Sequence, residues 1–163
     1  MTLVTVHCDS PPLTQGETNT QLADFELPSA PGNERQAMDQ IAEAVASLGL
    51  PPDRLEKLKT AVAEATMNGM EHGNHYRDDL LVRVQAESDS QRLLVRITDH
   101  GRGTEIPDPA TPDIDLKLAG LQSPRGWGLF LIKSMVDGMN VTDDGQRHTL
   151  ELVINMVEQK DTD

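Results

Sequence analysis

The chain has 163 residues, which suits a single domain of ordinary size. It carries 14 Lys+Arg against 27 Asp+Glu, a formal net charge of −13, and this argues against direct binding to nucleic acid or to an anionic membrane. One Trp, one Tyr and two Phe are too few for a base-stacking platform. The single cysteine, the absence of a long apolar run and the absence of a basic secretory start predict a cytoplasmic protein in a reducing compartment.

Residues 1–23 are rich in Thr, Ser, Pro, Gln and Asp, so we expect a tail or a loosely attached extra strand. A short strand is predicted at 25–27. Asn33 is expected to cap a helix over 34–48, because apolar residues recur there on one stripe and Gly49 supplies a left-handed stop.

A second helix is predicted from Pro52 to about residue 72, opened by a Pro-Pro-Asp sequence. Alternating apolar residues then predict two strands at 80–86 and 93–99. The stretch 101–125 is rich in Pro and Gly, and a loop of that length in a compact domain is usually functional or disordered.

A third helix is predicted from Gly126 to 137, followed by a hairpin of strands 139–143 and 148–157 around an Asp-Gly turn. This order of elements predicts an α+β fold, a two-layer sandwich with helices on one face of a mainly antiparallel sheet. We expect the folded domain to span 24–157 and an acidic C-terminal tail to follow at 158–163.

The first candidate motif places Glu64, Asn68 and His72 four residues apart on one face of the second helix. A carboxylate can deprotonate a nucleophile while a carboxamide oxygen one turn away ligates Mg²⁺. A solvated polar face is the plain alternative. The Asn68-Gly69 pair argues against this alternative, because a glycine inside a helix lowers helix stability by about 1 kcal/mol relative to alanine.

The second motif is Asp99 with Gly101 and Gly103, at the end of a predicted strand. A carboxylate there can accept a hydrogen bond from an exocyclic amine, and the glycines let a flat ring approach the backbone. The alternative is a glycine turn stabilised by the Asp side chain.

The third motif is Gly126 and Gly128, followed by Leu129, at the start of the third helix. Bare backbone N–H groups and the helix dipole favour an anion at such a place, although glycines also begin helices for packing reasons.

In this order and spacing, the three motifs resemble the N box and the two glycine boxes of the GHKL ATPases, which have the Bergerat ATP-binding fold. The sequence is most similar to the bacterial anti-sigma-factor serine/threonine kinases. The resemblance rests on EATMNGMEHG at 64–73, DHGRG at 99–103 and GWGLFLIKSMVD at 126–137.

The resemblance implies that Glu64 is the general base and that Asn68 holds Mg²⁺. It also implies that Asp99 reads the adenine amino group of ATP, that Gly103 lies against the ring with Gly101 beside it, and that Thr149 assists from the last strand.

On the phosphate side, the resemblance implies that Gly126 and Gly128, with Leu129, bracket the phosphates under an ATP lid at 103–125. Arg125 is a candidate phosphate contact, and a solvated loop arginine is the equal alternative. The family's Gly-Thr pair is replaced here by His148-Thr149. The histidines show no metal-ligand spacing, so we expect surface or loop positions for His148 and the others.

The function that the resemblance implies is an ATP- and Mg²⁺-dependent serine/threonine protein kinase. It would phosphorylate a small antagonist protein, with a sigma factor as a further candidate partner. A serine hydroxyl needs a base, so Glu64 favours transfer to an alcohol or hydrolysis. The alternatives are a nucleotide-gated binding module without turnover and one domain of a larger assembly. Related kinases are often dimers, and the sequence leaves a homodimer open.

Overall fold

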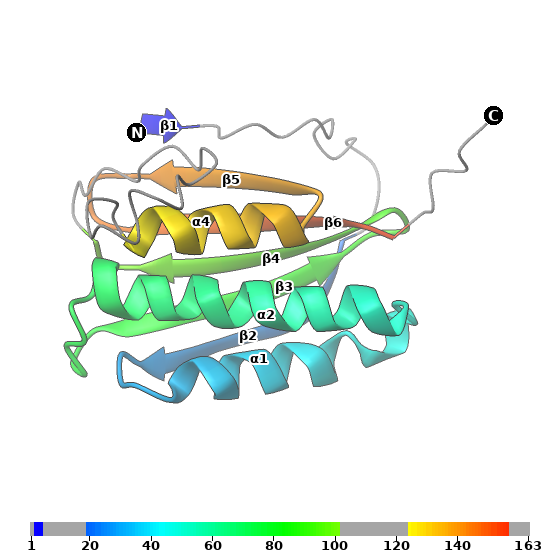
Figure 1. Cartoon of the computed structure of the whole chain (residues 1–163), viewed down its shortest axis with the longest axis horizontal. Coiled ribbons are helices and arrows are strands. Elements are labelled where there is room, and N and C mark those ends of the chain that lie inside the picture. The colour runs from blue at the N-terminus through cyan, green and yellow to red at the C-terminus, as the bar shows by residue number, and fades with distance from the viewer. Residues whose placement is uncertain (1, 5–18, 102–123, 157–163) are drawn as a thin grey trace.

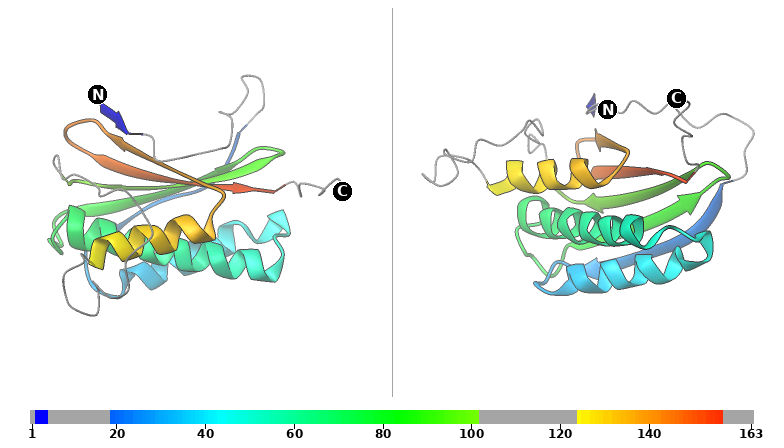
Figure 2. Two further views of the ribbon diagram at one scale, coloured as in Figure 1. Left: turned by 45° about the horizontal axis from the view of Figure 1, so that its top comes forward. Right: turned by 45° about the vertical axis from the view of Figure 1, so that its right-hand side comes forward.

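A computed structural model of the chain describes residues 2–4, 19–101 and 124–156. These residues form a two-layer α+β sandwich, in which a six-stranded sheet with the order β1-β5-β6-β4-β3-β2 packs against helices on one face (Figures 1 and 2). All the strand pairings are antiparallel. The fold class predicted from the sequence is therefore confirmed.

Along the chain, two strands are followed by two helices, two strands, one helix and two strands. In order they are β1 (Thr2–Val4), β2 (Thr20–Pro28), α1 (Asn33–Ala44), the 3₁₀ turn η1 (Ala46–Leu48), α2 (Pro52–Asn68), the π-helical turn η2 (Gly69–Gly73), β3 (Leu81–Ser88), β4 (Arg92–Asp99), α4 (Pro124–Met135), β5 (Gly138–Asp143) and β6 (His148–Asn155).

One hydrophobic core fills the space between the helices and the sheet. The alternate residues of the central strands that face the helices are buried, as are the apolar stripes of the helices. In the described part of the chain, none of the helices combines the length and apolar character needed to cross a bilayer. Core residues with 1% exposure or less include Ile41, Leu58, Val62, Val84, Val95, Ile97, Ile132 and Leu152.

The first helix differs from the prediction at both ends. Gly32, with φ of 101°, precedes it, and Asn33 is its first residue rather than its cap. The Asn33 side chain donates instead to the carbonyl of Pro28 at 2.7 Å. The helix ends at Ala44, and the tighter 3₁₀ turn η1 replaces its last predicted turn before Gly49, at φ of 68°, ends that segment.

Two element starts lie two or more residues earlier than predicted. β2 begins at Thr20 rather than at 25, because pairing with β3 extends a polar edge segment that lacks apolar alternation and contains a register shift between Gln21 and Ala23. α4 begins at Pro124 rather than at Gly126, since proline suits a first helical position, where its missing N–H costs nothing.

The sheet face away from the helices carries paired charges. Arg96 lies between Glu87 and Glu151, at 2.8 and 2.7 Å, and Arg83 binds Asp24 through two contacts of 2.9 and 2.7 Å. Cross-strand pairs of opposite charge stabilise a half-exposed sheet modestly. This face therefore tolerates water, and the helices are needed only on the other face.

Asn74 connects the loops at one end of the sandwich. It is completely buried, its Oδ1 accepts the backbone N–H of His100 at 2.7 Å, and its Nδ2 donates to the Ser29 hydroxyl at 2.9 Å. The Ser29 hydroxyl in turn donates to the Leu80 carbonyl at 2.7 Å. One amide thus ties the ends of β2, η2 and β4 to the start of β3.

We expect Asn74→Ala to lower the free energy of unfolding by about 2–4 kcal/mol, because it leaves buried polar partners unsatisfied. Denaturant unfolding of the variant and the wild type measures the difference. Asn33→Ala is the matched control, since its hydrogen bond is exposed, and it should cost less than about 1 kcal/mol. Equal losses in the two variants would contradict the role given to Asn74.

Candidate functional site

The three sequence motifs meet at one end of the sandwich. The C-terminal end of α2, the end of β4 and the start of α4 lie together at the left of Figure 1, where β6 also begins. The contacts that join them run from β4 to the turn after α2, and from α2 to α4. The site is therefore assembled from segments that are distant in the sequence.

Asp99 is the centre of this end. It is 6% exposed, and its Oδ1 accepts the backbone N–H of Gly101 at 2.7 Å. A Cβ atom on Gly73 would collide with the Asp99 carboxylate, and one on Gly101 would lie 2.7 Å from Oδ1. The backbone can approach the carboxylate this closely only because both positions are glycine.

His148 is the neighbour of Asp99 that the sequence analysis missed. The predicted surface or loop position is wrong, because His148 is 6% exposed and its Nδ1 lies 3.4 Å from Asp99 Oδ2. The two residues are directly paired across β4 and β6. The sequence contains the pattern that predicts this position. His148 lies two and four residues before the buried Leu150 and Leu152, so it shares their core-facing side of the strand.

Thr149 lies on the opposite face of the sheet. Its hydroxyl is 3.0 Å from that of Thr98, with which it is paired in register. Successive side chains of a strand point to opposite faces, so Thr149 and Asp99 are not brought together. The polar side chain that β6 presents beside Asp99 is that of His148.

Asn68 joins the first motif to the third. A Cβ atom on Gly128 would lie 3.0 Å from Asn68 Nδ2 and 3.3 Å from Oδ1, so the start of α4 rests directly on this amide. The Nδ2 atom is buried and has no hydrogen-bond partner among the described residues. The Nδ2 atom is a donor, so its unused hydrogen bond suits an acceptor on a ligand, while the carboxamide oxygen is the atom that suits Mg²⁺.

Among the described residues, no cluster of three His, Cys, Asp or Glu side chains could hold a metal ion. Mg²⁺ in phosphate-binding sites is usually held by one or two protein oxygens, with phosphates and water completing its shell. The Asn68 amide is consistent with that kind of site.

The start of α4 offers backbone donors to an anion. Because the helix begins at Pro124, the N–H groups of Arg125 and Gly126 have no acceptor within the helix. The N–H groups of Gly128 and Leu129 fall within the helical hydrogen-bond ladder, and the Leu129 side chain is 3% exposed in the core. Of the predicted phosphate contacts, the backbone near Gly126 is therefore the best placed.

Gly103 and most of the predicted lid lie outside the described residues, as does the side chain of Arg125.

Glu64 lies on α2 one turn before Asn68 and is partly buried. Burial raises the pKa of its carboxyl above the ordinary value of 4.5, and the negative charge of Glu34 raises this pKa further. A general base works best with a pKa closer to the working pH. The environment of Glu64 therefore shifts the pKa of its carboxyl toward the working pH.

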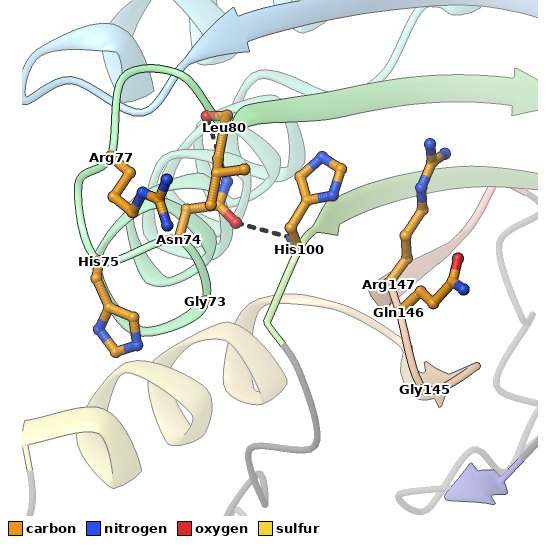
Figure 3. Close-up of a pocket in the computed structure, with 9 residues that line it drawn as sticks. All are labelled: Gly73, Asn74, His75, Arg77, Leu80, His100, Gly145, Gln146 and Arg147. Carbon is orange, nitrogen blue, oxygen red and sulfur yellow. Dashed lines mark hydrogen bonds between the residues drawn. The ribbon is translucent and has the colours of Figure 1, made fainter.

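A cavity of about 930 Å³ opens beside this end of the sandwich (Figure 3). Gly73, whose other side covers Asp99, contributes to its wall. His75 and the adjacent Tyr76 adopt positive φ angles of 52° and 54°, a sparsely populated conformation that clusters at functional sites. The residues around the cavity are Gly73, Asn74, His75, Arg77, Leu80, His100, Gly145, Gln146 and Arg147.

We expect Glu64→Gln to stabilise the ligand-free protein at neutral pH. A pKa that is higher in the folded state than in the unfolded state makes the ionised carboxylate destabilising, so the advantage of Gln should grow as pH rises above about 4.5 and vanish well below it. Melting temperatures measured across this range test the sign.

Asp79→Asn serves as a control of opposite sign, because a hydrogen bond from Arg77 lowers the pKa of Asp79. Its loss of stability should appear at neutral pH and disappear in acid. The same pH trend in both variants would contradict the assignment for Glu64.

The chain is similar to a known domain family and to several known proteins. Residues 27–154 match the histidine kinase-like ATPase domain. The chain is similar to the anti-sigma F factor of Clostridium beijerinckii, with 30% identity over 120 residues that cover 74% of this chain and 83% of that protein. For the anti-sigma F factor of Clostridium botulinum, the identity is 28% over 130 residues, covering 77% and 87%.

The fold is also similar to a crystal structure of the RsbU and RsbW domains of a Mycobacterium tuberculosis protein. The TM-score is 0.53 at 16% identity, over 81% of this chain and 32% of that one. At this identity the likeness concerns the fold alone. On the family match and the similarity to its relatives, the chain belongs to the family of histidine kinase-like ATPase domains.

Proposed function

We propose that the chain is an ATP-dependent serine/threonine protein kinase that acts as an anti-sigma-type regulator. The observation that carries this proposal is the position of Glu64, a carboxylate with a raised pKa, one helical turn from the Asn68 amide on which α4 rests. A base for an alcohol and a candidate ligand for Mg²⁺ thus share one helix face.

In this proposal ATP binds between Asp99 and the start of α4. Asp99 accepts a hydrogen bond from the adenine 6-amino group, and Gly101 and Gly103 leave room for the ring. The bare N–H groups of the first turn of α4, with the Arg125 guanidinium, contact the phosphates.

Asn68 would hold Mg²⁺ through its carboxamide oxygen, with ATP phosphates and water as the other ligands. When bound, the ion neutralises charge on the phosphates as transfer proceeds. The contact of the Asn68 amide with Gly128, at the start of α4 where the phosphates are proposed to bind, supports this role.

Glu64 would act on the phosphoryl acceptor. As the hydroxyl oxygen of a serine or threonine bonds to the γ-phosphorus and the bond from that phosphorus to the β-phosphate bridging oxygen breaks, the Glu64 carboxylate takes the hydroxyl proton. A raised pKa makes the carboxylate a better proton acceptor near neutral pH than an ordinary glutamate.

The proposed partners follow from the relatives. Two similar proteins are named anti-sigma F factors, which supports a sigma factor and a small antagonist protein as partners in a cytoplasmic setting. The second candidate function is a nucleotide-gated binding module, in which the nucleotide alters partner affinity without phosphoryl transfer. Only this second function leaves Glu64 without a chemical role.

We expect Mg-ATP to stabilise the protein by about 2.7 kcal/mol at 100 times its dissociation constant. Asp99→Asn should remove most of this gain, because its amide NH₂ faces the adenine amino group without an acceptor. Thermal unfolding with and without nucleotide measures both effects. An unchanged melting temperature of the wild type in millimolar Mg-ATP would overturn the nucleotide site.

We expect Glu64→Gln to keep ATP affinity within about threefold while slowing phosphoryl transfer by about 10²–10⁴. Asn68→Ala should lose Mg²⁺-dependent affinity and transfer together, since the metal contacts the phosphates in both states. Transfer from radiolabelled ATP to a serine-bearing antagonist protein, together with equilibrium binding of ATP, separates the two effects.

Glu71→Gln is the matched control, because Glu71 lies in the next turn and is exposed, and it should leave both quantities unchanged. Transfer at the wild-type rate by Glu64→Gln would remove the role of Glu64 as the base. No transfer by the wild-type protein would remove the kinase and leave the nucleotide-gated module.

A further inference from the structure

We propose that the free edge of β2 is a docking site for a partner protein, which adds to the sheet an extended segment of alternating apolar and basic residues. β2 is the last strand of the sheet and is paired with β3 alone, and α1 lies along it on the helix side (Figures 1 and 2). The proposal concerns partner binding and does not depend on the proposed nucleotide site.

The outer edge of β2 offers backbone groups to a further strand. Every second residue of a paired strand turns its N–H and C=O toward its neighbour, and the residues between turn theirs outward. None of the described residues is hydrogen-bonded to the outward groups of β2. Lysines, prolines and bulges commonly prevent pairing at natural edges, and the segment from Ala23 to Leu27 contains none of them. This segment can therefore accept another strand.

A groove of about 290 Å³ lies between β2 and α1. Its apolar lining consists of Leu22, Ala23, Phe25 and Ala44. The register shift before Ala23 leaves Leu22 without a partner on β3, and the Leu22 and Phe25 side chains are only partly buried against the core. A strand added to β2 would direct every second side chain toward α1 and thus toward this groove. Those side chains should be apolar.

The charged groups around the groove determine which charge the partner needs. Asp24 and Glu43 line it, and Glu26 is exposed on the strand beside it. Arg83 is paired with Asp24 and also lies in the field of Glu26, so one cation faces two carboxylates on the strand. Glu43 has no ion pair with a described residue. An added segment would therefore be favoured by basic side chains and disfavoured by acidic ones.

The groove lies away from the proposed ATP site. It is built from the first half of β2 and the last turns of α1, whereas the loop after the other end of β2 is tied to the site by the bond between Ser29 and Asn74. Partner binding at the groove and nucleotide binding can thus be measured separately.

The test uses three synthetic peptides of the same length as β2, which has nine residues. The first alternates valine with lysine, so that one face is apolar and the other basic. The second alternates valine with glutamate. The third has the sequence of the first with a methyl group on every backbone nitrogen, which removes all its N–H donors. Equilibrium binding gives the affinities, and amide hydrogen exchange followed by NMR locates the bound peptide.

We expect the valine-lysine peptide to slow the exchange of the outward amides between Ala23 and Leu27 by about tenfold when it is present at ten times its dissociation constant. The valine-glutamate and methylated peptides should bind at least about tenfold more weakly. The double variant Glu26→Lys/Glu43→Lys should bind the first peptide about tenfold more weakly than the wild type.

The matched control is Glu56→Lys, because Glu56 is an exposed acid on α2 outside the groove, and its affinity should stay within about twofold of the wild type. Melting temperatures verify that the variants fold.

Absence of binding, equal binding of the methylated peptide, or slower exchange at a strand other than β2 would each overturn the proposal. Slow exchange of the outward β2 amides without peptide would also overturn it. A second copy would cover the edge if this protection rose with protein concentration together with a dimer in sedimentation, and the chain itself would cover it if the protection were independent of concentration. Failure to bind ATP would overturn the proposed function and leave the β2 proposal standing.

Discussion

The buried carboxylate of Asp99 is the constraint on which this end of the molecule depends. A charge removed from water is costly unless it is hydrogen-bonded, and here a backbone N–H and an imidazole supply the partners. The surrounding chain can come that close only without side chains, which explains glycine at 73 and 101. One carboxylate thus dictates the residues of a turn after α2, of the segment after β4 and of the start of β6.

The contact between Asn68 and Gly128 is the second constraint, and it explains a weakness in the sequence. An Asn-Gly pair ends an otherwise strong helix, which then continues as the π-helical turn η2. Such turns are frequent at functional sites, where they redirect the chain at a cost in helix stability. Here the redirection brings Gly73 against Asp99, while Asn68 meets α4. The loss of helix stability therefore serves the assembly of the site.

Basic side chains gather around one cavity despite the acidity of the whole chain. The net charge is −13, yet the cavity beside Asp99 is lined by two arginines and two histidines (Figure 3). On the far face of the sheet, acidic residues are matched by Arg83 and Arg96. Of the two cavity arginines, Arg77 is paired with Asp79, so the cavity wall is not simply cationic.

The sequence by itself determined the architecture, because apolar residues recur with the period of a helix or of a strand, and a layered core follows from that pattern. It also indicated the three motifs, since their residue types and spacing are local. Only the tertiary structure decided which side chains meet. The polar edge segment that begins β2 at Thr20 depends on pairing with β3, and the contact between Asp99 and His148 depends on the register of β4 with β6. Register joins residues far apart in the chain, and a shift of one residue, as between His148 and Thr149, moves a side chain to the other face of the sheet.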